Sequence, residues 1–274
     1  MTTRRMPLTL FALMATVVAQ AANAADENSD RWHFVAFLDL FIPVTVGGTT
    51  TFPPENGSDS IGFKEGAIIN NINMLFVGGF EARRDVWGLY IHGLYADIGN
   101  SRTSPDVIQI GGQPLPVGAT ATARLDFHGT FWTVAATFRA WNEPQRYMDT
   151  LAGVRFLDCT NAISWEVSGS DASVPPPSRA GYRTTKRSGG DGIVGVKGHY
   201  GASAGSPWFA SYYLDVGTGT SKLTWQAGVG IGYALNWGDI TAGWRHLDYQ
   251  MKSGSDLQSF YVDGPDIFLS LIHI

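Results

Sequence analysis

Charged side chains recur at alternate positions within several apolar segments, and these are the residues whose types and spacing could do chemistry. An Arg or Lys that faces hydrocarbon costs roughly 2–4 kcal/mol, so we expect these residues to turn toward a shared interior. There they would form either an interlocked network that fills the interior or a charged constriction that selects solutes. The candidates for this interior charge network are Asp39, Glu81, Arg83, Asp97, Arg139, Arg155, Lys197, Asp215 and Arg245.

No pattern for catalysis or metal binding emerges from the same search. A hydroxyl nucleophile needs a base within reach, and a His two residues before a Ser would supply one on a strand. None of the histidines has that neighbour, and no Cys/His cluster or strand-to-helix glycine loop indicates zinc or phosphate binding. We therefore expect no enzyme and no catalytic, cofactor or metal site. The histidines searched are His33, His92, His128, His199, His246 and His273.

The clearest element that could position such charges is the segment Leu223–Trp237, LTWQAGVGIGYALNW. Alternate residues form an apolar face, and the residues between them are small or polar, for fifteen residues without a break. A strand in a soluble protein usually has about five or six residues, whereas a tilted membrane-crossing strand needs about nine to eleven. Trp225 and Tyr233 would lie roughly 20 Å apart along the axis, near the two edges of a lipid-facing band. The segment therefore predicts a transmembrane β-strand.

Composition and the N-terminal residues indicate an exported protein that does not bind nucleic acid. Met1–Ala24 has Arg4 and Arg5, a short apolar run and an A-x-A site, so we expect a signal peptide cleaved after Ala24. Its removal leaves 25–274 with a net charge of −7, without the basic surface that nucleic-acid binding requires. The 33 glycines suit strands that curve into a barrel. The lone Cys159 is expected to be a buried side chain, not a reactive thiol.

The rest of the chain repeats the alternating pattern. It predicts an all-β fold, a single closed antiparallel up-and-down transmembrane β-barrel of about ten strands, with eight or twelve also compatible. Long outer loops are expected near 47–72, 100–121 and 168–191, with one short helical segment near 61–72, and short turns alternate with the outer connections. The expected strands are Trp32–Val46, Asn73–Arg83, Val86–Gly99, Thr122–Trp141, Met148–Val167, Gly192–Gly201, Trp208–Gly217, Leu223–Trp237, Asp239–Lys252 and Gln258–Phe268.

An internal repeat links two of the candidate cations. Ala152–Asp158 (AGVRFLD) matches Ala242–Asp248 (AGWRHLD) in five of seven positions, and Gly195-Val196-Lys197 is a shorter copy. The repeat puts a glycine and a cation on the same strand face. Because both full copies begin strands that leave a short turn, Arg155 and Arg245 are expected at similar depth.

The paired A-G-x-R-x-L-D strands, the G-x-K strand and the strand from Trp225-Gln226 to Gly232-Tyr233 resemble small outer-membrane β-barrels of Gram-negative bacteria. The likeness is to the membrane domain of OmpA-like proteins, over roughly residues 30–268. It implies insertion in the cell outer membrane, contact with outer-membrane lipid and lipopolysaccharide, and help from the barrel-assembly machinery during insertion. One departure is the end of the chain, Leu269–Ile274 (LSLIHI), which lacks the usual final aromatic residue and looks like translated cloning sequence, and this bears on the tenth strand.

Three functions remain open at this point. The favoured one is a structural or interaction protein with a largely plugged lumen, because ten strands enclose little free space once Arg155, Arg245, Tyr213 and Trp132 point inward. The others are a narrow porin-like channel for small solutes and a soluble periplasmic lipocalin-like barrel. Aromatic residues near strand ends are expected to anchor at the membrane interface: Trp32, Trp87, Trp165, Trp208, Trp225, Tyr233 and Trp237.

Overall fold

The computed structural model describes residues 31–52, 59–63, 72–103, 109–110, 113–114, 119–169, 180–203, 205–253 and 257–270. The expected signal peptide and the last four residues therefore lie outside the described residues. The strands are β1 (Trp32–Phe41), β2 (Thr45–Phe52), β3 (Asp59–Phe63), β4 (Ile72–Arg84), β5 (Trp87–Thr103), β6 (Gln109–Ile110), β7 (Gln113–Pro114), β8 (Ala119–Glu143), β9 (Arg146–Gly169), β10 (Ala180–Gly201), β11 (Trp208–Gly219), β12 (Ser221–Leu235), β13 (Gly238–Met251) and β14 (Leu257–Ser270).

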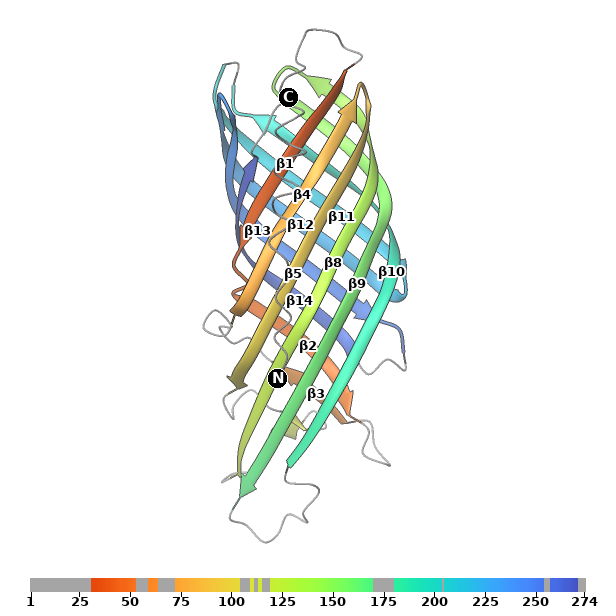
Figure 1. Ribbon diagram of the computed structural model, residues 1–274, viewed down its shortest axis with the longest axis vertical. Helices are drawn as coiled ribbons and strands as arrows, with labels where there is room; N and C mark the ends of the chain where they lie inside the picture. Colours follow the sequence, from red (N-terminus) through yellow and green to blue (C-terminus); the bar gives the residue numbers. More distant parts are fainter. Residues whose placement is uncertain are drawn as a thin grey trace, which may run out of the picture.

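Ten of these strands close an antiparallel barrel (Figure 1). Their order is β1-β4-β5-β8-β9-β10-β11-β12-β13-β14, and β14 returns to pair with β1, with Leu38 opposite Leu269. Short turns join the strands at one end, which we call the turn end (the upper end in Figure 1). The long connections lie at the other, the loop end, together with the one-residue connection between β11 and β12. The up-and-down barrel and its ten strands are thus confirmed, including the tenth strand. Within the described part of the chain, no helix is long and apolar enough to cross a membrane.

The segment expected as the first outer loop is partly strand. β2 continues beside β14 after a break at Pro43, where the Ile42 and Val44 N–H groups donate to the carbonyls of Pro265 and Asp263 at 3.0 Å each. β2 also pairs with β3. The loop prediction is therefore wrong for these two strands, because pairing with β14 gives a Gly- and Thr-rich segment the hydrogen-bond partners that local sequence cannot supply. The helical prediction near 61–72 is wrong for 61–63, and 64–71 lie outside the described residues.

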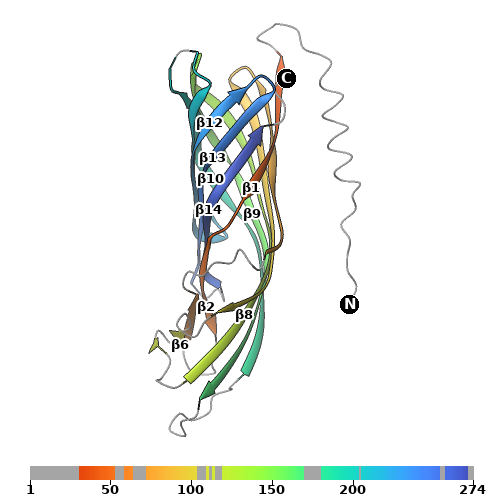
Figure 2. The ribbon, with the colours of Figure 1, turned by 90° about the vertical axis from the view of Figure 1, so that its left-hand side faces the viewer.

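Three strands run far past the others at the loop end. Figure 2 shows β8, β9 and β10 continuing beyond the rest of the wall as a three-stranded extension, which we call the blade. Consequently the expected loop 168–191 is shorter than predicted, since residues 180–191 belong to β10 and pair with β9. The expected loop 100–121 likewise loses its ends to β5 and β8 and contains the small β6–β7 hairpin.

Side chains alternate between an apolar outer face and a mixed inner face. On β12, Val229 and Ile231 are 66% and 65% exposed, whereas the inward Gln226 is 7% exposed. The outward face of β11 carries Leu214 and Val216, both exposed. The orientation expected from the alternation in Leu223–Trp237 is therefore confirmed.

The glycines of the internal repeat lie where strands approach most closely. A Cβ on Gly153 would collide with the carbonyl oxygen of Val134, and a Cβ on Gly243 with that of Val229. Gly195 of the shorter copy meets the carbonyl oxygen of Leu214 in the same way. Each glycine stands two residues before an inward cation, so close strand approach and a buried charge recur together.

This close approach predicts that Gly153→Ala destabilises the barrel, because the added Cβ would overlap backbone that cannot move independently. Overpacking of this kind costs about 1–3 kcal/mol. Gly192→Ala is the matched control, since a Cβ there has only the Thr218 carbonyl at 3.8 Å. The midpoint of denaturant unfolding in detergent, followed by the heat-dependent gel shift, measures both. Equal midpoints for the two variants would contradict the prediction.

Candidate functional site: the barrel interior

An ion cluster crosses the interior near the turn end. Arg83 Nη2 donates to Glu81 Oε1 at 2.8 Å and also binds Asp149, and Arg139 Nε donates to Asp149 Oδ1 at 2.5 Å. Lys197 pairs with Glu81 from the opposite wall, since these residues lie on β10 and β4. The five charged residues therefore tie four strands together across the lumen.

A second cluster surrounds Arg245 on β13. Its guanidinium lies 2.6 Å from Asp39 Oδ2 and 2.6 Å from Asp266 Oδ2. His92 Nε2, on β5, lies 3.1 Å from Asp39 Oδ2 and 3.0 Å from Arg245 Nη1. One cation thus bridges two carboxylates on neighbouring strands and an imidazole from across the barrel.

Arg155 on β9 is the centre of the third cluster and is 1% exposed. It forms an ion pair with Asp215 on β11 and donates to Gln226 Oε1 on β12 at 3.1 Å. The hydroxyl oxygens of Thr133 and Thr224 lie 3.3 and 3.4 Å from its guanidinium nitrogens. A buried guanidinium on β9 with four oxygen partners on three other strands, β8, β11 and β12, fixes the wall in place more than it offers a free charge to a solute.

The loop-end half of the interior is apolar, which the sequence reading did not anticipate. Aromatic rings stack there, with Phe127 and Phe260 centroids 5.2 Å apart and Phe131 and Phe260 centroids 5.9 Å apart. The buried cluster consists of Phe41, Val77, Leu94, Ala96, Phe127, Phe131, Leu157, Cys159, Leu247, Tyr249, Met251, Phe260 and Val262. Cys159 is thus a buried packing residue, as expected.

Where the polar and apolar halves meet, the interior holds a cavity of about 10 Å³. Phe131 and Leu247 line it from the apolar side, and His92, Arg155 and Arg245 from the polar side. A single water needs at least about 10–15 Å³. Both repeat arginines line this one cavity, as similar depth requires, and the cavity itself holds no more than about one water.

Eight of the nine candidate charges lie inside, and Asp97 does not. Asp97 faces outward on β5, 4.0 Å from the exposed His128 of β8. An outward charge costs free energy only where the outer face contacts hydrocarbon, and Asp97 lies where the apolar outer face ends. Trp132 also points outward, 47% exposed, against expectation. The sequence reading missed four inward groups whose partners lie on other strands: His92, Asp149, Asp191 and Asp266.

Most of the expected interface aromatics gather at the turn end, and Trp225 does not. It lies toward the loop end, with its ring centroid 4.6 Å from that of the His246 ring. The side chain of Trp165 is outside the described set. The larger group gathers on the exposed surface of the turn end and comprises Trp32, Trp87, Trp208, Tyr233 and Trp237.

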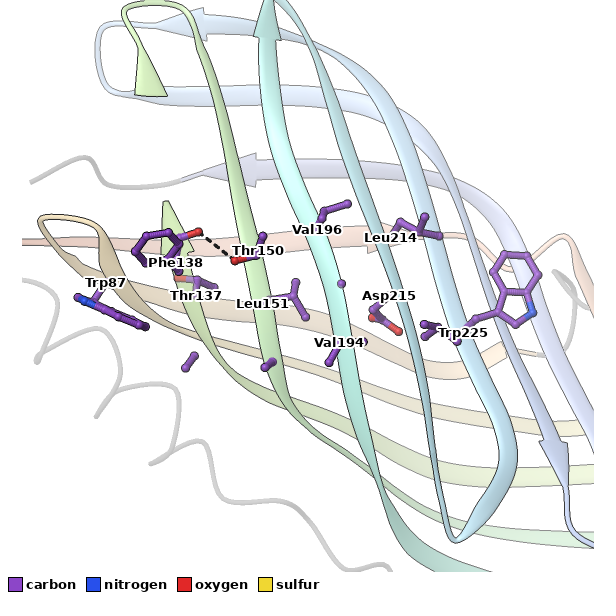
Figure 3. Close-up of a pocket in the computed structure, with 14 residues that line it drawn as sticks. Trp87, Thr137, Phe138, Thr150, Leu151, Val194, Val196, Leu214, Asp215 and Trp225 are labelled. Carbon is purple, nitrogen blue, oxygen red and sulfur yellow. Dashed lines mark hydrogen bonds between the residues drawn. The ribbon is translucent and has the colours of Figure 1, made fainter. Parts of the chain in front are cut away.

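A shallow groove of about 850 Å³ lies on the outer wall, lined by residues from β5 to β12 (Figure 3). The small side chains of Ala136, Thr150 and Ala152 line it together with the larger Phe138 and Leu214. Its outward residues are apolar apart from Thr150. No set of three metal-ligating side chains gathers anywhere in the described ranges.

No protein-family model matches the sequence, and no curated protein matches it. Among solved structures, the outer membrane protease OmpT from Escherichia coli is similar at 10% identity, with a TM-score of 0.45, covering 91% of this chain and 99% of that chain. The translocator domain of the autotransporter NalP from Neisseria meningitidis is similar at 10% identity, with a TM-score of 0.27, covering 96% of this chain and 95% of that chain. A mutant of the monoaromatic hydrocarbon channel TodX is similar at 8% identity, with a TM-score of 0.25, covering 89% of this chain and 91% of that chain. These distant likenesses say nothing of the activity of this chain.

The Arg155 cluster predicts a large effect from removing one partner. Arg155→Met leaves the Asp215 carboxylate buried without its cation, which should lower the free energy of unfolding by roughly 3–5 kcal/mol. Combining it with Asp215→Leu removes the stranded charge and should restore most of the loss. Denaturant unfolding in detergent measures both, with Lys222→Met at an exposed site as control. A single variant as stable as the double variant would refute this account of the cluster.

Proposed function

We propose that this protein is an integral β-barrel of the cell outer membrane with a sealed lumen and a non-catalytic, structural or interaction role. The observation that carries the proposal is Arg155, which is 1% exposed and held inside the barrel by partners on three other strands. A charge so fully satisfied closes the lumen and has no capacity left for a passing solute.

Membrane insertion is supported by the height of the apolar outer face. On β9 the outward residues run from Thr150 through Ala152 and Val154 to Phe156, and polar residues begin at Asp158. With the outward Met148 nearer the turn end, this face covers nine residues. At ~3.3 Å each and tilted about 40°, they span ~23 Å, close to the ~25 Å height of a lipid-facing band. A soluble lipocalin-like barrel would need a polar exterior, and these exposed residues argue against that alternative.

The turn end is proposed to face the periplasm. Trp32 and Ser270, at the outer ends of β1 and β14, both lie there, and its exposed tryptophans would sit at headgroup level. The blade and the long connections then project outside the cell. Contacts with outer-membrane lipid and lipopolysaccharide, and insertion by the barrel-assembly machinery after cleavage at Ala24, belong to the same proposal.

Localisation is tested by fractionating cells that express the full chain. The protein should enter the outer-membrane fraction, begin at Ala25 by N-terminal sequencing, and migrate differently on a gel before and after boiling, because a closed barrel resists detergent unfolding. A soluble band with no heat-dependent shift would refute the membrane assignment.

Lumen closure is tested separately in planar bilayers. The folded protein should give no conductance steps, because the ion clusters and the apolar layer block the path in series. Arg155→Ser combined with Arg245→Ser and Phe131→Ser removes the side chains around the small cavity and should produce steps. Regular steps from the unaltered protein would favour the narrow-channel alternative instead.

A further inference from the structure

One edge of the blade is open along β10. β10 pairs with β9 in an unbroken register from Ala180 opposite Glu166 to Tyr200 opposite Arg146. Its other neighbour, β11, reaches only as far as Asp191. Among the described strands, none pairs with this edge of β10 before Gly190, so a long stretch is bonded on one side only.

The backbone groups that face this open edge can be identified from its last bonded residue. The Gly190 carbonyl accepts from the Thr220 N–H at 3.1 Å, and the Gly190 N–H donates to Thr220 Oγ1 at 3.0 Å. In an antiparallel ladder, every second residue turns its N–H and C=O to the same side. The residues that present both groups to the open edge are therefore Tyr182, Thr184, Lys186 and Ser188.

The usual devices that blunt an edge strand are mostly missing here. Natural edges are kept short, bulged or interrupted by proline. Residues 180–190 contain no proline, and the β9 register beside them shows no shift. The opposite edge of the blade differs, because β5 covers β8 up to Ala123 opposite Thr103 and only Ala119–Thr122 extends beyond it.

The one device left that could keep this edge from pairing is charge, and every charged side chain of residues 180–190 is positive. Residues 180–190 contain Arg183, Lys186 and Arg187 and no Asp or Glu, in a chain of net charge −5. The Lys186 side chain is exposed, and Tyr182 beside it is 71% exposed. Arg187 is half-buried and donates to the Thr220 carbonyl at 3.4 Å, which places its charge at the inner end of the edge.

We propose that the open edge of β10 over residues 180–190 binds an extended, acidic polypeptide segment, which adds to the blade as a further strand. Backbone hydrogen bonds from the four edge-facing residues would give affinity, and carboxylates beside Lys186 and Arg187 would select acidic sequences. The inference deepens the interaction role and rests on the proposed function in one respect, that the blade lies outside the membrane.

Binding is tested with the full-length folded protein in detergent and a fluorescent peptide of alternating threonine and glutamate. Fluorescence anisotropy should show saturable binding, and a peptide with lysine in place of glutamate should not bind. Hydrogen exchange on the unaltered protein should slow at the amides of Tyr182, Thr184, Lys186 and Ser188, and stay unchanged at Thr185, whose N–H faces β9. No slowing at the four amides would overturn the proposal.

Variants separate backbone pairing from simple charge attraction. Thr184→Pro removes an N–H that faces away from β9, which an edge strand tolerates, and should weaken binding roughly tenfold, while Thr184→Val keeps the N–H and should bind within about twofold. Lys186→Glu with Arg187→Glu should weaken binding roughly tenfold at low salt, with a smaller effect at high salt. Inorganic polyphosphate that binds equally well, with no effect of Thr184→Pro on the peptide, would overturn strand addition. The heat-dependent gel shift of each variant reports the barrel independently, so loss of binding with the shift retained concerns the edge alone.

Discussion

A charge placed inside a barrel wall must find a partner there, and this constraint organises the interior. Arg155, Arg245 and Lys197 each enter from a strand whose glycine, two residues earlier, lets the neighbouring backbone approach closely. Their carboxylate partners come from other strands, one to four places around the wall. Strand register, lumen filling and the internal repeat are therefore consequences of one requirement, that each buried charge has an opposite charge beside it.

The division of the lumen into a charged half and an apolar half follows the same logic. Ion pairs need geometric precision, which the turn end supplies, since its short turns hold adjacent strands in fixed register. Toward the loop end three strands extend past the others, and the longest connections lie there. The interior at that end is filled by Phe127, Phe131 and Phe260, whose stacking tolerates small displacements. The two halves fill the interior by different means, one with ion pairs and the other with packed apolar side chains.

The sequence alone could predict which way each side chain turns, because alternation and the cost of charge in lipid act residue by residue. That reasoning places Arg155 and Asp215 inside and Val229 outside. It fails for Asp97, where the outer face is no longer apolar and the cost of facing outward vanishes. It could not pair Lys197 with Glu81 or Arg245 with His92, because those contacts depend on strand tilt and stagger around the whole barrel. β2 and the first half of β10 were likewise missed, since pairing with β14 and β9 creates them.

The blade differs from an ordinary surface loop because the barrel fixes its shape. β9 and β10 keep one register from the ion clusters to the tip of the blade, so the open edge is an extension of a rigid wall. A segment that pairs with it would meet hydrogen-bond donors and acceptors already in line, and the ordering cost would fall on the partner alone. The ion clusters support this arrangement, since Asp149 and Arg155 of β9 and Lys197 of β10 are tied through them to other strands. The interior thus supplies rigidity to the strands that extend past the rest of the wall, and the proposed recognition uses that extension.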